Sequence, residues 1–349
     1  MMIHTKGDLQ QMQSLPLSAK ILMTKRRIRE WYDYWDGQVY VSFSGGKDST
    51  VLLHIARELY PDIEAVFVNT GLEYPEIQSF VKTFDNVTIL RPKMRFDEVI
   101  KKYGYPIISK EVSQRIHEYR HNSSGWIKDR WDVNGKYASK YGTRFDISKW
   151  KPLRDSDIPV SHKCCMVMKK APAKMYEKET GKKPILATMA DESALRATEW
   201  MKNGCNAFDN KRARSAPMSF WTEQDVLQYI KENNIPIASV YGDVVYKEDS
   251  DQMRIEDYGI EGCGTEKLCT TGCNRTGCIF CAFGAHLDER GGGKSRFERL
   301  KETHPRQYEY CIGGGEYVNG VWQPNKQGLG MGHVFDELNK IYGDGFIKY

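Results

Sequence analysis

The stretch VYVSFSGGKDSTVLLHIAR, from Val39 to Arg57, decides the fold of this 349-residue chain. Its first five residues are mostly β-branched or aromatic, which is typical of a short buried strand. Two glycines follow, and glycine lets the backbone turn sharply and approach an anion closely. The apolar run at residues 50–57 then indicates a helix. This strand–turn–helix order places the free N–H groups of a helix start beside the turn, where anions bind.

The turn itself, residues 44–49, carries side chains suited to a nucleotide's phosphates. Ser44 and Ser49 supply hydroxyl donors, Lys47 supplies a positive charge, and Asp48 can hold Mg²⁺. The segment matches neither the G-x-x-x-x-G-K-[ST] phosphate loop nor the G-x-G-x-x-G dinucleotide fingerprint. We therefore predict a phosphate-binding loop of another kind.

Working outward from this loop, strands alternate with helices, as in a parallel sheet with crossover helices. The next strand is predicted at residues 63–68, and the polar loop 69–71 follows it. A polar, Trp-rich stretch at 123–157 is predicted to be an insertion or lid. Further strands are predicted at 87–90 and 184–188, and helices at 18–36, 96–102, 110–120, 165–180 and 219–233.

Composition limits the compartment and the partners. No apolar run is long enough to span a bilayer, and the N-terminal residues lack the apolar core of a secretory signal. We therefore expect a cytosolic protein with no membrane partner. The net charge of +5 is mild, and the basic clusters at 25–27 and 211–214 are typical of solvated surface.

The nine cysteines are distributed unevenly. Five lie between Cys263 and Cys281, and Cys164 is followed directly by Cys165. In a reducing compartment such a cluster indicates a metal site or an iron–sulfur cluster rather than disulfides. Cys205 and Cys311 stand apart, and we interpret them as ordinary small residues.

The loop at 44–49 resembles the SGGxDS loop of the PP-loop ATP pyrophosphatases. Four more segments resemble, in the same order, those of the phosphoadenosine phosphosulfate (PAPS) reductase family, at residues 68–76, 163–172, 191–197 and 216–236. The resemblance implies an α/β fold, with a parallel twisted sheet and helices on both faces, of the adenine nucleotide alpha-hydrolase type. The predicted organisation is a helical segment at 1–36, a nucleotide-binding domain at 37–250 and a Cys-rich loop module at 251–349.

The resemblance also implies the site. ATP and Mg²⁺ are the expected ligands, and we expect Lys47, Asp48 and Arg196 to act in catalysis. The residues expected to bind the nucleotide are Ser42, Ser44, Gly45, Gly46, Lys47, Asp48, Ser49, Asn69, Thr70 and Gly71.

The cysteines resemble the Cys-Cys…Cys-x2-Cys set that holds a [4Fe–4S] cluster in adenosine-phosphosulfate reductases. Four thiolates also suit Zn²⁺, which stays an alternative. Cys165, Cys278 and Cys281 are the first three candidate ligands, and Cys164 and Cys273 compete for the fourth position.

Two departures from the family guide the functional hypothesis. The loop is intact, whereas sulfonucleotide reductases have usually degraded it, and the chain ends without their Glu-Cys-Gly-Leu-His type of tail. We therefore expect an ATP pyrophosphatase that adenylates an acceptor and supports sulfur transfer, as in DNA phosphorothioation or RNA thiolation.

The expected partners are a nucleotide, nucleic acid and a sulfur donor such as a cysteine desulfurase, and an oligomer is compatible with the sequence. Three alternatives stay open: a sulfonucleotide reductase, an enzyme like the small subunit of ATP sulfurylase, and a nucleotide-sensing module without activity.

Overall fold

The computed structural model describes residues 2–349 except 142–146, 209–212, 248–266 and 292. The chain forms two compact units built from interleaved segments. Unit 1 comprises residues 1–69, 73–91 and 173–276, and unit 2 comprises residues 70–72, 92–172 and 277–349. The predicted boundary between residues 250 and 251 lies outside the described residues.

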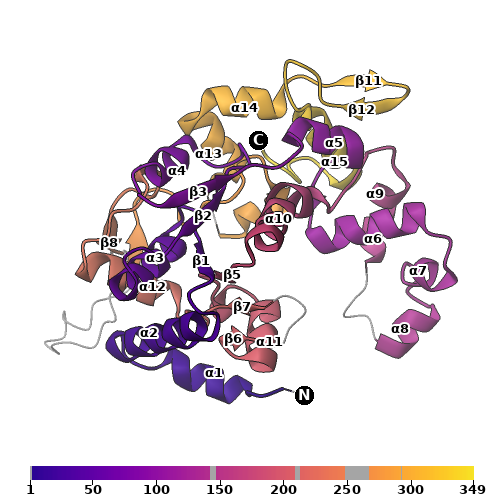
Figure 1. Ribbon diagram of the computed structural model, residues 1–349. Helices are drawn as coiled ribbons and strands as arrows, with labels where there is room; N and C mark the ends of the chain where they lie inside the picture. The colour runs from indigo at the N-terminus through magenta and orange to yellow at the C-terminus, as the bar shows by residue number, and fades with distance from the viewer. Residues whose placement is uncertain (1, 142–146, 209–212, 248–266, 292) are drawn as a thin grey trace, which may run out of the picture. The chain divides into compact units, whose positions relative to one another are not determined.

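Unit 1 is built on a six-stranded sheet, in which β1 lies between β2 and β5 (Figure 1). The paired strands run parallel except for the edge strand β6, which is antiparallel to β7. This topology confirms the predicted α/β class with a mostly parallel sheet. In sheet order the strands are β3 (Val87–Leu90), β2 (Ala65–Val68), β1 (Val39–Ser42), β5 (Lys183–Ile185), β7 (Arg214–Ser215) and β6 (Asn206–Ala207).

Helices flank this sheet and bury its apolar side chains. Val41, Leu52 and Trp221 are fully buried in one hydrophobic cluster, which joins β1 to the neighbouring helices. A short hairpin and two 3₁₀ turns, η4 and η5, complete unit 1. The elements are α1 (Lys6–Gln13), α2 (Leu17–Tyr34), α3 (Lys47–Leu59), α4 (Pro75–Val81), η3 (Met166–Lys170), α10 (Ala171–Thr180), η4 (Ala190–Glu192), α11 (Ala194–Asn203), α12 (Glu223–Glu232), η5 (Ser239–Tyr241), β8 (Val244–Tyr246) and β9 (Leu268–Thr270), with η3 and the start of α10 belonging to unit 2.

Helix α12 begins four residues later than predicted, and its cap explains the difference. The Thr222 hydroxyl accepts a hydrogen bond from the backbone N–H of Asp225, while the Asp225 carboxylate accepts from the backbone N–H of Thr222. This reciprocal capping box satisfies two donors at the helix start, so the helix begins at Glu223 rather than at Ser219.

A buried ion pair joins α2 to this cap. The Lys20 side chain is 2% exposed, and its Nζ lies 2.6 Å from Oδ2 and 2.8 Å from Oδ1 of Asp225. Lys20 also donates to the carbonyl oxygen of Gln13 at 2.7 Å. A charge removed from water is tolerated only when it is paired and hydrogen-bonded, as Lys20 is.

Unit 2 contains short strands and many helices. Its two-residue strand β4 (Ile107–Ile108) pairs in parallel with β10 (Ala282–Phe283), and β11 (Glu316–Val318) forms a hairpin with β12 (Val321–Gln323). The predicted helices at 96–102 and 110–120 correspond to α5 (Phe96–Tyr103) and α6 (Lys110–His121). The other helical elements are α7 (Gly125–Asp129), α8 (Lys136–Tyr141), η2 (Ser148–Trp150), α9 (Lys151–Asp155), η7 (Ala285–Gly291), α13 (Arg296–Thr303), α14 (Pro305–Ile312) and α15 (Met331–Tyr342).

One arginine ties the end of the predicted insertion to α6. The Arg120 guanidinium donates to the carbonyl oxygens of Leu153, Arg154, Ser156 and Ile158, at 2.7 to 2.9 Å. Its five N–H groups in a planar fork allow one side chain to satisfy four carbonyl groups. The chain is thereby fixed shortly before it reaches the paired cysteines at 164 and 165.

Among the helices of the described residues, none combines the length and the apolar character needed to cross a membrane.

Candidate functional site

The predicted phosphate loop lies where the strand order of the sheet reverses. From β1 the chain continues to β2 on one side, whereas β5 pairs with the other side of β1. In open α/β sheets the crossover helices diverge at such a point, and ligands bind outside the carboxyl ends of the strands; the region formed by residues 44–49 and the loop after β5 is called the crevice below.

Hydroxyl groups hold the loop in shape. The Ser49 Oγ accepts from the backbone N–H of Ser44 at 3.1 Å and donates to the carbonyl oxygen of Gly46 at 3.0 Å. The Ser44 and Ser49 Oγ atoms are 3.0 Å apart. Helix α3 has no side-chain hydrogen bond at its N-cap, Gly46. The backbone N–H of Lys47 interacts with the Tyr241 hydroxyl, and the next N–H groups of α3 lie at the positive end of the helix dipole, where anions bind.

Gly45 can be only glycine. Its φ of +72° lies in the left-handed region, and a Cβ there would lie 2.8 Å from Ile77 Cγ2 and 2.9 Å from Val81 Cγ2 on α4. A side chain would therefore combine backbone strain with a steric clash. The close packing of α4 against this turn keeps the loop compact around the helix start.

Lys47 places the positive charge of the loop in a buried position. Its side chain is 6% exposed, and its Nζ lies 3.2 Å from a carboxylate oxygen of Glu223 on α12. The same Nζ lies 5.4 Å from the centre of the Tyr241 ring. A carboxylate and an aromatic face thus hold the ammonium group of Lys47 at the loop.

Asp48 lies among several charges. Burial raises the pKa of its carboxyl above the usual value, while Lys47, Arg275 and Arg196 act to lower it. Glu223 adds to the upward shift of this pKa. A partly desolvated carboxylate of this kind is a good ligand for Mg²⁺, because the ion would compensate its charge.

Two arginines meet at one carboxylate beside Asp48. Glu192 ends η4, and its carboxylate pairs with both Arg196 on α11 and Arg275 after β9. Its Oε2 also accepts from the backbone N–H of Met189 at 3.2 Å, so the carboxylate is anchored to the loop that follows β5. Burial lowers the pKa of Arg196, and the neighbouring positive charge of Arg275 lowers it further. The crevice therefore holds three cations, Lys47 included.

Asp48→Asn is expected to stabilise the unliganded protein at pH 7 and to weaken Mg²⁺-dependent ATP binding at least about tenfold. Because burial raises the pKa of Asp48, the folded state binds its proton more tightly than the unfolded state does. The ionised carboxylate thus disfavours folding above its folded-state pKa, and this penalty disappears as the pH falls below the unfolded value.

The gain in melting temperature should accordingly shrink between pH 7 and pH 4, which thermal unfolding at each pH would measure. Asp33→Asn, at an exposed position on α2, serves as the control with no expected change. Equal melting temperatures for Asp48→Asn and wild type at pH 7 would contradict the conclusion that burial of the Asp48 carboxylate destabilises the folded state.

The remaining predicted nucleotide residues are divided between the units. Ser42 ends β1, and Asn69 follows β2 at the same carboxyl edge as the loop, with its N–H bonded to the carbonyl oxygen of Leu90. Thr70 and Gly71 belong to unit 2. Ser42 and Asn69 therefore lie at the same edge of the sheet as residues 44–49. That these two residues, together with Thr70 and Gly71, bind the nucleotide stays a prediction.

Four of the candidate metal ligands belong to unit 2, namely Cys164, Cys165, Cys278 and Cys281, and all four are half-buried. The Sγ atoms of Cys164 and Cys165 are 3.9 Å apart. The fifth candidate, Cys273, belongs to unit 1. The choice of ligands among these five cysteines stays a prediction.

A short segment of unit 2 explains why these distant cysteines are neighbours. Tyr105 forms a parallel bridge with Val160, shortly before Cys164. Two residues later, Ile107 pairs with Ala282, directly after Cys281. Residues 105–108 thus lie between the two cysteine segments and hold both by backbone pairing.

The thiols interact electrostatically. The Cys164 thiol lowers the pKa of Cys165 to about 6 by hydrogen bonding, and Lys169, Lys110 and Lys170 lower it as well. The pKa of Cys164 is raised by its bond to Cys165, by burial and by Cys281 and Cys278. Within the described ranges, however, no three His, Cys, Asp or Glu side chains converge closely enough to hold one metal ion. The thiols are neighbours without forming a closed single-ion site.

Sequence analysis missed several residues of the crevice. Glu223 and Tyr241 contact Lys47, and Arg275 contacts Glu192. The signal for Arg275 was available, since a basic residue stands between Cys273 and Cys278 in a segment already suspected of function. Nothing local distinguishes Glu223 from other acidic residues in the first turn of a helix.

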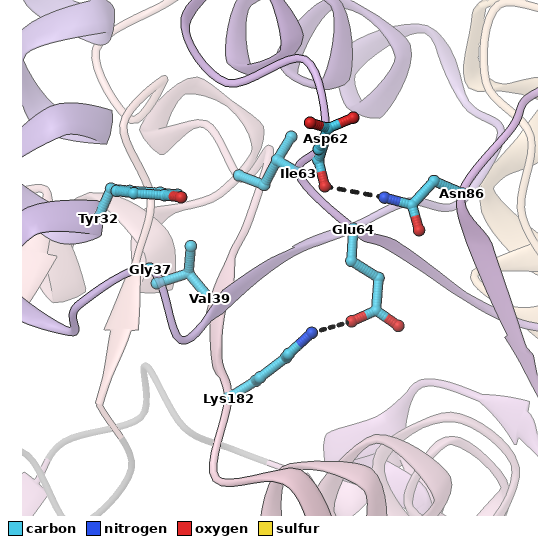
Figure 2. A pocket seen from close by; sticks show the side chains of 8 residues that line it. All are labelled: Tyr32, Gly37, Val39, Asp62, Ile63, Glu64, Asn86 and Lys182. Atoms are coloured by element: carbon cyan, nitrogen blue, oxygen red, sulfur yellow. Dashed lines mark hydrogen bonds and ion pairs between the residues drawn. The ribbon is translucent and has the colours of Figure 1, made fainter.

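Two recesses accompany the sheet of unit 1. One, of about 360 Å³, lies at the amino ends of the strands, opposite the phosphate loop. Figure 2 shows its polar lining, in which Lys182 pairs with Glu64 and Asn86 bonds to Asp62. The other, of about 200 Å³, is bordered by Arg196 at the carboxyl ends. Of these two recesses, the second therefore lies at the same end of the sheet as the crevice.

Comparison with known proteins gives a family match over most of the chain. The model of the phosphoadenosine phosphosulfate reductase domain matches residues 38–283. Sulfate adenylyltransferase subunit 2 of Shewanella frigidimarina is 24% identical over 262 residues, covering 68% of this chain and 74% of that protein. An uncharacterized protein of Methanocaldococcus jannaschii is 37% identical over 87 residues, and the chain spans 21% of its length.

Among solved structures, the phosphoadenylyl-sulfate reductase of Candida auris in its phosphate complex aligns with a TM-score of 0.35 and 14% identity. The alignment covers 74% of this chain and 95% of that chain.

Proposed function

The chain belongs to the phosphoadenosine phosphosulfate reductase domain family, and from this premise we propose that it is an ATP pyrophosphatase that adenylates an acceptor and supports sulfur transfer. One observation carries the proposal. Asp48 lies in the first turn of α3 beside the buried Lys47, and the two arginines that pair with Glu192, Arg196 and Arg275, act on its carboxyl at the switch point of the sheet. Such a crevice suits a polyanion that brings a divalent cation.

In the proposed reaction, a nucleophilic oxygen of the acceptor attacks the α-phosphorus of ATP. The bond between the α-phosphorus and the bridging oxygen breaks, pyrophosphate leaves, and the acceptor carries AMP as its leaving group. A sulfur nucleophile then displaces AMP. The loop N–H groups and Lys47 would stabilise the negative charge that develops on the departing pyrophosphate. Arg196 would do the same from the β5 side, and Asp48 would hold Mg²⁺.

The iron–sulfur cluster belongs to the same proposal. The donor set fits it, because four thiols of one unit belong to the two segments that residues 105–108 hold by backbone pairing, and three lysines lower the pKa of one of them, Cys165. We assign Cys164, Cys165, Cys278 and Cys281 as ligands, with Cys273 as the competing fourth. When bound, the cluster would supply electron transfer; Zn²⁺ at these thiols would instead be structural.

Nucleic acid is the acceptor that we propose, with a cysteine desulfurase or a similar sulfur donor as partner in the cytoplasm. Charge supports this choice. Residues 92–172, the largest segment of unit 2, contain 18 Lys and Arg against 9 Asp and Glu, although the whole chain has a net charge of only +5. A basic excess of this kind attracts a phosphate backbone.

Sulfate is a second candidate acceptor. The Shewanella relative bears the name sulfate adenylyltransferase subunit 2, and the recess of about 200 Å³ beside Arg196 is small for an organic substrate. With sulfate, the product would be adenosine phosphosulfate, and the chain would act together with a partner subunit.

Anaerobic purification, followed by iron and acid-labile sulfide analysis and by pyrophosphate assays, tests the proposal. We expect about four irons per chain and pyrophosphate release from ATP that depends on nucleic acid. Release that depends on sulfate would establish the second candidate. Sulfite formation from PAPS without ATP turnover would contradict both. Zinc in place of iron would remove the redox part and leave the nucleotide chemistry.

A further inference from the structure

We propose that Arg275 is a second phosphate-binding arginine of the nucleotide site, specific for the β,γ-pyrophosphate portion of ATP. The inference rests on the proposed function and assigns one further contact within it. Arg275 stands in the short segment between Cys273 and Cys278, far along the chain from the loop at residues 44–49.

The backbone before Arg275 is fixed against η5. The N–H groups of Thr271, Gly272 and Cys273 donate in turn to the carbonyl oxygens of Asp243, Tyr241 and Val240, at 2.9 to 3.0 Å. Gly272 permits this contact, because a Cβ there would lie 2.4 Å from the Val240 oxygen. The segment therefore leaves β9 along a single defined path.

The residue after Arg275 is fixed at the phosphate loop itself. The Thr276 Oγ1 lies 2.5 Å from the Tyr241 hydroxyl, and the ring of Tyr241 lies 5.4 Å from the Lys47 Nζ. A Cβ on Gly46 would lie 3.3 Å from the Tyr241 hydroxyl and 3.9 Å from the Thr276 Oγ1. Arg275 is thus held between two anchored neighbours at the rim of the loop.

The side chain of Arg275 then approaches a group of the same charge. It pairs with Glu192, whose carboxylate also pairs with Arg196, and the two guanidinium groups act on each other unfavourably. Glu192 neutralises only one of the two arginines. The carboxylate of Asp48 also acts on both of them, but in the proposed site its charge would be taken up by Mg²⁺. A ligand with several negative charges would relieve the remaining repulsion, and its oxygens could accept from the N–H groups that Glu192 does not use.

Pyrophosphate is the part of ATP that meets this requirement. Arg275 and Arg196 share the carboxylate of Glu192, and both of them, with Lys47, act on the carboxyl of Asp48 in the first turn of α3. AMP lacks both phosphates of the pyrophosphate portion, so a contact from Arg275 to that portion would not contribute to AMP binding. Arg275 is moreover 64% exposed at its side chain, so it can turn toward a ligand without unfolding its surroundings.

Isothermal titration of wild type, Arg275→Ala and Arg275→Lys with ATP, AMP and inorganic pyrophosphate tests the inference. Arg275→Ala should weaken the affinity for ATP and for pyrophosphate about 10- to 100-fold, and the affinity for AMP less than about threefold. The affinities of Arg275→Lys for ATP and pyrophosphate should lie between those of wild type and Arg275→Ala, because lysine keeps the charge but lacks the planar guanidinium group. Arg26→Ala is the matched control, since Arg26 is also an exposed arginine of unit 1 paired with a carboxylate, Glu30. It should bind all three ligands as wild type does.

Unchanged ATP affinity in Arg275→Ala, with an unchanged melting temperature, would overturn the inference and leave the proposed function intact. An equal loss for AMP and ATP would also overturn it. Wild-type protein that binds neither ATP nor pyrophosphate would instead contradict the proposed function itself.

Discussion

Lys47→Ala is expected to lower kcat/KM for pyrophosphate release from ATP by about 100- to 1,000-fold, the usual effect of removing one preorganised charge donor from a reacting centre. Lys47 is the cation of the loop, and its side chain is 6% exposed beside Glu223 and Tyr241. In this setting water competes weakly with the substrate for the ammonium group, so a contact to a phosphate oxygen is worth far more than on the surface.

The loss should not come from unfolding. Glu223, the ion-pair partner of Lys47, is 50% exposed, so water can solvate its carboxylate after the substitution. Lys340→Ala, which removes a 72% exposed lysine of α15 paired with Glu337, is the control with unchanged rate. A discontinuous assay of pyrophosphate release, with acceptor present, measures the rate for wild type, Lys47→Ala and Lys340→Ala. A Lys47→Ala rate within threefold of wild type would exclude Lys47 from the chemistry.

Lys20→Met is expected to lower the free energy of unfolding by about 3–5 kcal/mol, because it leaves the Asp225 carboxylate buried without its cation. The carboxylate also serves the capping box of α12, so the substitution would strain the start of the helix that carries Glu223. Urea unfolding at pH 7, followed by far-UV circular dichroism, measures the change. Nucleotide affinity should fall in parallel with stability.

Lys25→Met is the matched control on the same helix. Lys25 pairs with Glu58 at 3.0 Å, but the two side chains are 27% and 41% exposed, so this pair is expected to contribute less than about 1 kcal/mol. Adding Asp225→Asn to Lys20→Met removes the stranded charge and should recover part of the loss. Equal effects of Lys20→Met and Lys25→Met would show that burial does not strengthen the first pair.

The phosphate loop could be predicted because its signal is local. Strand, glycine turn and helix follow each other within residues 39–59, and the structure confirms them as β1 and α3. The α/β class followed from the same alternation. Helix ends were less certain, as α12 illustrates, because the hydrogen bonds of Thr222 and not the apolar period decide where it begins.

Residues that complete the crevice could not be predicted in this way. Glu223 lies 176 positions after Lys47, and only the packing of α12 beside α3 brings them together. The thiols of unit 2 depend on β4, whose two residues are too few to show any period. Long-range pairing of very short strands cannot be recognised from the local sequence pattern. The spacing of the cysteines, by contrast, indicated a metal or iron–sulfur site from the sequence alone.

Because the two units are built from interleaved segments, they limit what a single recombination event within the gene can exchange. A break between residues 172 and 173 would leave Lys47 and Asp48 on one piece and Arg196 and Arg275 on the other, and it would likewise divide Cys164 and Cys165 from Cys278 and Cys281. No single crossover in the gene passes on the phosphate crevice without part of the thiol set, or the thiol set without part of the crevice. A single recombination event therefore cannot exchange the complete set of crevice residues independently of all four thiols.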